Sequence, residues 1–147
     1  MDFNPIAKGI HLEGIALDDS TLWYSDVMAG GIHRLESNGN ITTWRQDSLC
    51  IGGILINADG KVISTGEGGI VWNDPATGAT GVLIDQVEGQ PILGVNEMAV
   101  WRDGGIAFGT LDTPAFTQSR DPGPSALYLL SADRKVTQLC NGLKFSN

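Results

Sequence analysis

The fold is decided by residues 12–26, which read LEGIALDDSTLWYSD. A short apolar run is followed by a polar Asp-Asp-Ser turn and by a second apolar run that ends on Asp26. The same layout returns in residues 53–65, GILINADGKVIST, and in residues 96–110, NEMAVWRDGGIAFGT. A strand, a tight turn and a second strand thus recur about every forty residues, which is the period of a propeller blade.

Each repeat continues into two further short strands, so that one repeat makes a four-stranded meander. In the first repeat the last two strands flank Asn38-Gly39, the strongest short signal for a hairpin. We expect blade 1 at about residues 13–46, blade 2 at 51–86 and blade 3 at 96–140 of a single domain, residues 1–147. The sequence therefore predicts an all-β fold of three four-stranded antiparallel blades.

Residues 141–147 resemble the start of a fourth blade that then stops. Three blades form only an arc, because propellers close with roughly four to eight blades. An open arc leaves two blade faces uncovered, which promotes association. We therefore expect either a fragment of a longer chain or a ring completed by another copy.

Composition excludes several classes of protein. A net charge of −8 without a cluster of basic residues argues against nucleic-acid binding and against binding to an anionic membrane. The first residues lack a basic segment and an apolar segment, and no run is long enough to span a membrane, so the expected location is cytoplasmic. Cys50 and Cys140 lack metal-ligand spacing and are interpreted as two small core residues.

Other polar and aromatic residues receive structural interpretations. Residues 111–125, rich in Pro, Thr, Ser and Asp, are expected to form a surface loop at one mouth of the fold. Asp26 and Asp112 each follow a second strand and are expected to accept hydrogen bonds from backbone amides of a turn. Packing between blades is the interpretation for the four tryptophans, Trp23, Trp44, Trp72 and Trp101.

Three motifs carry a resemblance to a known family: Leu12-Glu13-Gly14, Val95-Asn96-Glu97-Met98 and Phe145-Ser146-Asn147. With them the chain resembles the N-terminal half of the senescence-marker-protein/gluconolactonase/luciferin-regenerating-enzyme family, which includes regucalcin. The resemblance implies half of a six-bladed β-propeller with a divalent cation in its central channel. It also implies an ancestral activity on lactones or related esters.

The resemblance implies roles for three residues. Glu13 and Asn147 match metal ligands of the family, and Asn96 matches a residue that contacts substrate. The ion would be calcium, magnesium, manganese or zinc, because carboxylate and amide oxygens suit hard cations. Glu97 and Met98 stand where the family prefers Asp and Gly. The aspartate proposed as general base belongs to the half that this chain lacks, so no catalytic residue is assigned.

Two functions remain open at this point. One is a metal-dependent lactonase-like hydrolase that needs a complementary half, and the other is a non-catalytic half-propeller that serves as a binding or assembly module. We expect a two-fold homodimer that completes the ring. Glu13 of the second copy would then take the place of Asn147. We therefore expect residues 142–147 to be displaced or disordered, and two Glu13 carboxylates to face the channel from opposite sides.

Overall fold

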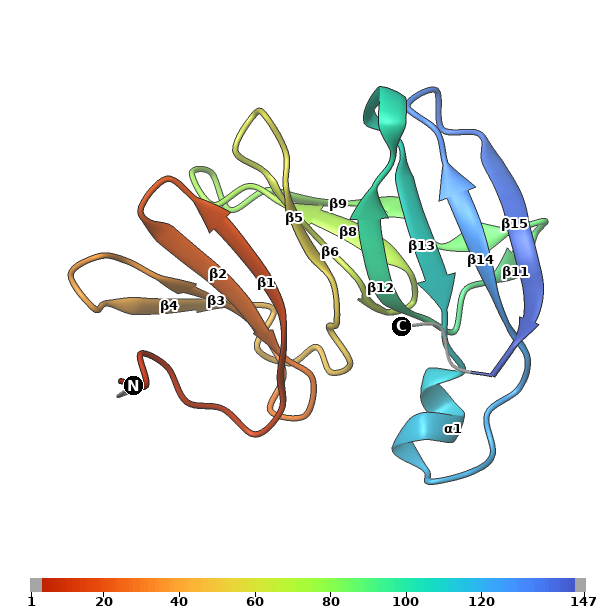
Figure 1. Ribbon diagram of the computed structural model, residues 1–147, viewed down its shortest axis with the longest axis horizontal. Helices are drawn as coiled ribbons and strands as arrows, with labels where there is room; N and C mark the ends of the chain where they lie inside the picture. The colour runs from red at the N-terminus through yellow and green to blue at the C-terminus, as the bar shows by residue number, and fades with distance from the viewer. Residues whose placement is uncertain (1–3, 145–147) are drawn as a thin grey trace.

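The computed structural model describes residues 4–144, and they form three large antiparallel sheets (Figure 1). Blade 1 contains four strands in chain order, β1 (Leu12–Asp18), β2 (Thr21–Asp26), β3 (Ile32–Leu35) and β4 (Ile41–Trp44). Blade 2 contains β5 (Ile54–Ile56), β6 (Val62–Ser64), β8 (Ile70–Asn73) and β9 (Thr80–Ile84). Blade 3 contains β12 (Gly94–Val100), β13 (Ile106–Thr110), β14 (Ser125–Leu130) and β15 (Val136–Leu143). The predicted half-propeller of three four-stranded antiparallel blades is confirmed.

Short elements that the repeat did not predict connect blades 2 and 3. The two-residue strand β7 (Gly66–Glu67) pairs with β12 and adds a fifth strand to that sheet. A small hairpin of β10 (Gln86–Val87) and β11 (Gln90–Pro91) precedes blade 3. Two-residue strands carry no alternation of apolar and polar side chains, so sequence patterning cannot detect them.

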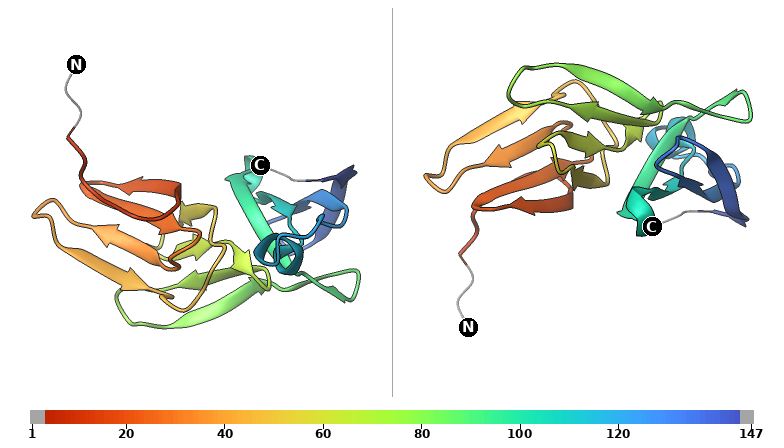
Figure 2. Two further views of the ribbon diagram at one scale, coloured as in Figure 1. Left: turned by 90° about the horizontal axis from the view of Figure 1, so that it is seen from below. Right: turned by 90° about the horizontal axis from the view of Figure 1, so that it is seen from above.

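The three blades follow one another along an arc, with blade 2 between blades 1 and 3 (Figure 2). The first strand of each blade is the innermost, and β5 contacts both β1 and β12. Because side chains alternate between the two faces of a strand, each blade can pack against a neighbour on either side. Blade 2 therefore has both faces covered, whereas blades 1 and 3 each have one covered face.

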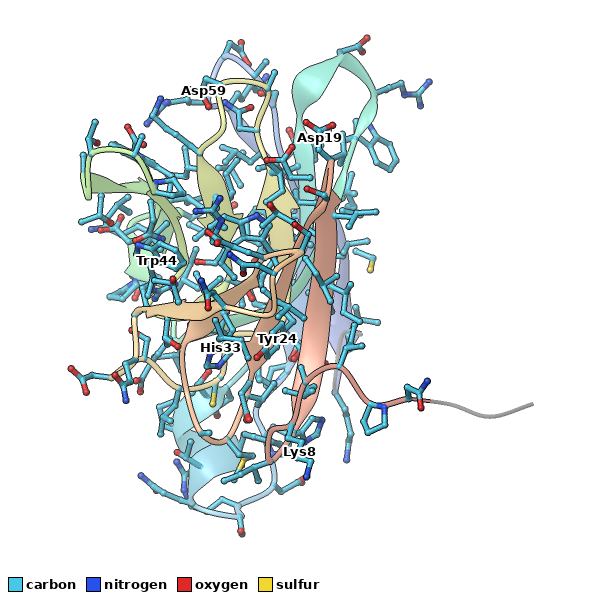
Figure 3. All side chains as sticks on the ribbon, turned by 90° about the vertical axis from the view of Figure 1, so that its left-hand side faces the viewer. Lys8, Asp19, Tyr24, His33, Trp44 and Asp59 are labelled. Carbon is cyan, nitrogen blue, oxygen red and sulfur yellow. The ribbon has the colours of Figure 1, made fainter. Side chains whose placement is uncertain are left out.

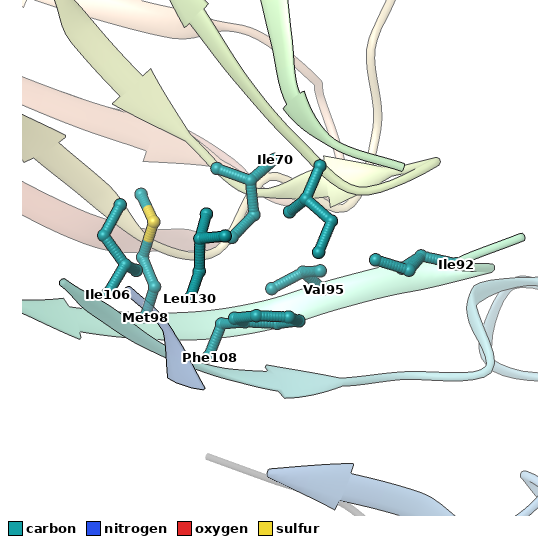
Figure 4. Close-up of a cluster of buried hydrophobic side chains, with 8 residues drawn as sticks. Ile70, Ile92, Val95, Met98, Ile106, Phe108 and Leu130 are labelled. Carbon is teal, nitrogen blue, oxygen red and sulfur yellow. The ribbon is translucent and has the colours of Figure 1, made fainter. Parts of the chain in front are cut away.

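Two apolar clusters fill the junctions between blades. Between blades 1 and 2 the buried side chains are Trp23, Ile32, Ile51, Ile54 and Val62. Between blades 2 and 3 they are Ile70, Ile84, Ile92, Val95, Met98, Ile106, Phe108 and Leu130 (Figure 4). Burial of these side chains is the main term that holds the blades together, at about 1.5–3 kcal/mol for each large apolar side chain.

Glycines let the innermost strands approach closely. A Cβ atom on Gly14 would lie 2.0 Å from the carbonyl oxygen of Gly52 in blade 2. One on Gly52 would lie 2.1 Å from the carbonyl oxygen of Asn96 in blade 3. Real Cβ atoms do not come this close to a backbone oxygen, so a side chain at either position would push two blades apart.

Four details differ from the sequence-based expectations. Cys50 is buried as expected, but Cys140 is exposed on the outer strand β15. Trp101 follows β12 and remains 36% exposed, so it does not pack between blades. The loop after β13 contains a short helix, α1 (Thr113–Thr117), and a 3-10 turn (Arg102–Gly104) connects β12 to β13.

The chain end differs as well. β15 continues to Leu143, so residues 141–143 belong to the outer strand of blade 3 and not to a fourth blade. Residues 145–147, including Asn147, lie outside the described residues. Within residues 4–144, no helix is long and apolar enough to cross a membrane.

Candidate functional site

A cavity of about 160 Å³ lies where the innermost strands of blades 1 and 3 begin. Its lining joins residues far apart in sequence: His11, Glu13, Val27, Cys50, Asn96, Leu111 and Phe116. Two of the three predicted site residues, Glu13 and Asn96, thus come together at one end of the arc. Asn147, the third, falls outside the part of the chain that the structure describes.

Asp26 positions the segment that leads to Glu13. The carboxylate of Asp26 is only 1% exposed and accepts hydrogen bonds from the backbone amides of Ile10 at 2.7 Å and His11 at 3.1 Å. It also accepts from the amides of Met28 at 3.1 Å and Ala29 at 2.9 Å. The predicted turn-capping role is therefore confirmed, and it extends to the residues just before β1. Glu13 is half-buried at the second position of that strand.

These four amides also determine the pKa of Asp26. Burial by itself raises the pKa of this carboxyl, but the four backbone hydrogen bonds stabilise the charged form more strongly. The net result is a pKa below the ordinary value of 3.8. Asp26 is therefore a charged structural anchor at neutral pH.

Asn96 is held by its main chain. It is 6% exposed, and its carbonyl oxygen accepts from the amide of Gly53 and from Thr65 Oγ1, both at 3.0 Å. Thr65 is fully buried and also accepts from the amides of Gly52 at 3.1 Å and Gly53 at 2.8 Å. An equivalent link joins blades 1 and 2, because Ser25 Oγ accepts from Gly14 at 2.8 Å and donates to the carbonyl of Gly52 at 2.9 Å.

Cys50 places a neutral thiol in the cavity wall. Its backbone is left-handed, with φ of 56°, and its amide donates to the carbonyl of Val27 at 2.9 Å. Burial raises the pKa of the Cys50 thiol, and the nearby carboxylates of Glu67 and Glu13 raise it further. The thiolate is the nucleophile in cysteine chemistry, so this environment opposes a nucleophilic role.

Glu97 adds a second carboxyl group close to Glu13. Burial raises the pKa of Glu97, the hydrogen bond from the amide of Met98 opposes this, and the charge of Glu13 raises the pKa again. In the sequence, Glu97 stands out only as a departure from the family motif. Because Glu97 directly follows Asn96 on β12, the sequence could have indicated a second acidic group near the channel.

Two apolar side chains line the cavity on the side of blade 3. They are Leu111, which follows β13, and Phe116 on the helix α1. Asp112 fixes this segment by accepting from the amides of Ala115 at 3.1 Å and Gly123 at 3.2 Å, as expected for a turn cap. The loop predicted at one mouth of the fold therefore supplies part of the cavity wall.

A second cavity adjoins the first. It measures about 400 Å³ and shares three lining residues with it, Val27, Cys50 and Phe116. Its remaining lining is Met28, Leu49, Thr117 and Ser119.

The described residues do not form a complete cation site. Among residues 4–144, no three or more His, Cys, Asp or Glu side chains lie together so that they could hold a metal ion. The cavity offers the Glu13 carboxylate and the Asn96 amide, whereas Ca²⁺ binds six to eight oxygens and Mg²⁺ about six. The chemistry of the two donors suits a hard cation, but their number is insufficient without oxygens from elsewhere.

Comparison with known proteins gives a consistent picture. The family model described as SMP-30/Gluconolactonase/LRE-like region matches residues 12–147. No curated protein matches the chain in sequence. The solved structures that resemble it include three with a TM-score of 0.76: a gluconolactonase from Xanthomonas campestris, a calcium-binding regucalcin from Agrobacterium tumefaciens and a luciferin-regenerating enzyme.

The alignments with these structures cover nearly all of this chain but only about half of each neighbour. Sequence identities are 20%, 20% and 21%, and 91%, 96% and 93% of this chain is covered. Only 48%, 46% and 47% of the respective neighbours is covered, so the chain spans about half of their length. At this level of identity the likeness shows a shared fold.

Proposed function

Because the chain belongs to the SMP-30/gluconolactonase/LRE-like family, we propose that it is half of a divalent-cation-dependent hydrolase of lactones or related esters. The proposal requires a complementary half that supplies further oxygen ligands and a general base. One observation carries it. Glu13 of blade 1 and Asn96 of blade 3, which are distant in sequence, line the same cavity at the same end of the arc.

The residues of the cavity suit such a reaction in three ways. The Glu13 carboxylate would hold the cation, and the buried Asn96 would hold either the cation or the substrate through its side-chain amide. Leu111 and Phe116 would exclude water from the apolar side of the substrate. A bound divalent cation would supply polarisation of the ester carbonyl and a more acidic water.

A second candidate is a binding or assembly module without catalysis. It is favoured by the large apolar side chains that remain exposed on the innermost strand of blade 1, Ile15 at 69% and Leu17 at 71%. Exposed apolar patches on folded proteins mark interaction surfaces.

Calorimetry and an activity assay distinguish the two candidates. The 147-residue chain is titrated with calcium, magnesium, manganese and zinc, and hydrolysis of a simple aldonolactone is followed with the ion that binds. We expect a saturable isotherm that Glu13→Gln weakens at least about tenfold. The matched control is Glu88→Gln, an exposed glutamate in the turn between β10 and β11.

Each outcome has a clear meaning. If an ion binds and Glu13→Gln binds it as tightly as the unmodified chain does, Glu13 is not a metal ligand and the hydrolase proposal is wrong. Ion binding that depends on Glu13 supports the cation site of the first candidate, and lactone hydrolysis is expected only when a complementary half supplies the general base.

A further inference from the structure

Blade 1 has an apolar row on the face turned away from blade 2. The strand register pairs Leu17 with Leu22, Leu22 with Leu35, and Leu35 with Ile41, so the row crosses all four strands. Ala16 packs against the cluster between blades 1 and 2, and side chains alternate along a strand, so the neighbouring Leu17 points the other way. Leu17 is 71% exposed and Ile41 is 49% exposed.

A second row lies beside the first on this face. It contains Ile15, Tyr24, His33 and Thr43. The rings of Tyr24 and His33 stack with centroids 4.8 Å apart, and Figure 3 views the molecule from this side. Together the two rows form the uncovered face of blade 1. Tyr24 and Leu35 are already buried within it, and its exposed apolar part lies along β1.

Most of the corresponding row is covered in both other blades. In blade 2 it begins with Ile56 and Val62, which pack in the junction with blade 1. In blade 3 it contains Ile106, Leu130 and Val136, which pack in the junction with blade 2, whereas Val100 at its innermost end is 67% exposed. The row in blade 1 is also apolar and has the same strand register. It therefore resembles the faces that already pack against a neighbouring blade at the two junctions within this chain.

Blade 3 has a complementary uncovered face. The row turned away from blade 2 contains Ala99, Ala107, Leu129 and Thr137. At the two innermost positions blade 2 has the larger Leu55 and Ile63. The small side chains of blade 3 leave a hollow of about 340 Å³, lined by Glu97, Met98, Ala99, Ala107, Phe108, Gly109 and Leu127.

We propose that the hollow face of blade 3 binds the uncovered face of blade 1 of a second copy of this chain. The large side chains of Ile15 and Leu17 would enter the hollow left by Ala99 and Ala107. The chain covers 46–48% of three similarly folded proteins, so two copies together match the length of about one of them. Each copy supplies one face of each kind, and a two-fold axis therefore covers all four faces at once.

The ring brings the second copy into the candidate site. A two-fold axis along the channel keeps both sets of Glu13 and Asn96 at the same mouth. Two Glu13 carboxylates then face one channel and attract a cation more strongly than one does. This is the arrangement expected from the sequence, in which Glu13 of the second copy takes the place of Asn147.

The test uses two variants that each damage one face. Leu17→Asp places a charge in the blade 1 face, and Ala107→Glu fills the hollow of blade 3. Sedimentation equilibrium of the unmodified chain is expected to give twice its mass of 15.6 kDa. Each variant alone is expected to weaken the dimer by about a hundredfold or more. The matched control is Val82→Asp on blade 2, an exposed apolar position at 51% that lies on neither face.

Mixing the two variants tests the direction of the contact. A mixed pair retains one intact junction, formed by the undamaged blade 3 of one variant and the undamaged blade 1 of the other. We therefore expect the mixture to associate more tightly than either variant alone, with circular dichroism showing that all chains are folded.

Three results would overturn the proposal. The first is a monomer mass for the unmodified chain at all concentrations. The hollow face of blade 3 would then not bind a second copy of this chain. The second is a dimer that both variants leave intact. The third is a dimer that Leu17→Asp abolishes and Ala107→Glu does not, which would indicate contact between two blade 1 faces.

Discussion

At the scale of single residues, Asp26 has the largest set of specific contacts near the site. It accepts four backbone hydrogen bonds, two from the lead-in segment and two from the turn after β2. Hydrogen bonds to a charged group contribute more than neutral ones, and a buried donor left without a partner costs about 1–3 kcal/mol. Asp26 therefore fixes the path of the chain into Glu13 without lining the cavity.

Replacement of Asp26 by Asn should reduce stability at neutral pH by about 3 kcal/mol, because the charge is lost and the new NH₂ group faces at least one backbone donor, the amide of Ile10. The folded pKa of Asp26 lies below 3.8, so its contribution is present above that pH and is lost as the pH falls through the folded pKa. Urea unfolding at pH 7 and pH 3 measures this. Asp26→Asn should lose less stability on acidification than the unmodified chain.

The control for this experiment is Asp47→Asn, at an exposed position. Equal acid sensitivity of the Asp26 variant and the unmodified chain would mean that the four hydrogen bonds contribute nothing to the pH dependence.

At the scale of elements, hydroxyl groups at the ends of second strands join one blade to the next. Ser25 donates to the backbone of blade 2, and Thr65 donates to the backbone of blade 3. Both residues are fully buried. In blade 1, Ser25 lies two residues after Trp23, which pairs with Ala16 on the innermost strand. In blade 3, Ala107 pairs with Ala99 in the same way, so the residue two positions later, Gly109, corresponds to Ser25. Blade 3 therefore lacks this hydroxyl at its uncovered face, and the proposed junction depends on apolar packing.

Thr65→Val keeps the shape of the side chain and removes its hydroxyl, so the amide of Gly52 loses the acceptor that Thr65 provides. We expect a loss of about 2 kcal/mol in the free energy of unfolding. Amide hydrogen exchange should also be faster at the start of β5. Thr65→Ser retains the hydroxyl and should cost about 1 kcal/mol, mainly from the missing methyl group. If the two variants lose equal stability, the hydroxyl does not stabilise the junction.

At the scale of the whole molecule, charge opposes the proposed dimer. Each copy carries a net charge of −8, so two copies repel one another, whereas the proposed contact surface is largely apolar. Salt screens charges over about 10 Å at 0.1 M and about 3 Å at 1 M. The balance between repulsion and apolar burial should therefore depend on ionic strength.

Raising sodium chloride from about 0.02 M to about 0.5 M should lower the dimer dissociation constant several-fold, because repulsion is screened while apolar contacts persist. Analytical ultracentrifugation across this range measures the effect. A dissociation constant that rises with salt would instead indicate an interface held by opposite charges, contrary to the proposed one.

Some residues of the candidate site could be predicted from the sequence and others could not. Glu13 and Asn96 could be selected from motifs, and Asp26 and Asp112 could be assigned as turn caps from their places after strands. Phe116 and Leu111 could not be found in this way, because they enter the cavity only when a loop folds over the arc. Cys140 was misassigned, since apolar character does not reveal whether a face has a neighbour to cover it.

The sequence by itself determined the strands, their tight turns and the threefold repeat. These features depend on contacts between residues only a few positions apart, so composition and alternation are sufficient to predict them. The tertiary structure decided which faces are covered and which residues share the cavity. Those outcomes depend on contacts between strands about forty residues apart, such as Gly14 with Gly52 and Gly52 with Asn96. No local pattern encodes such approaches, because each requires the geometry of two complete blades.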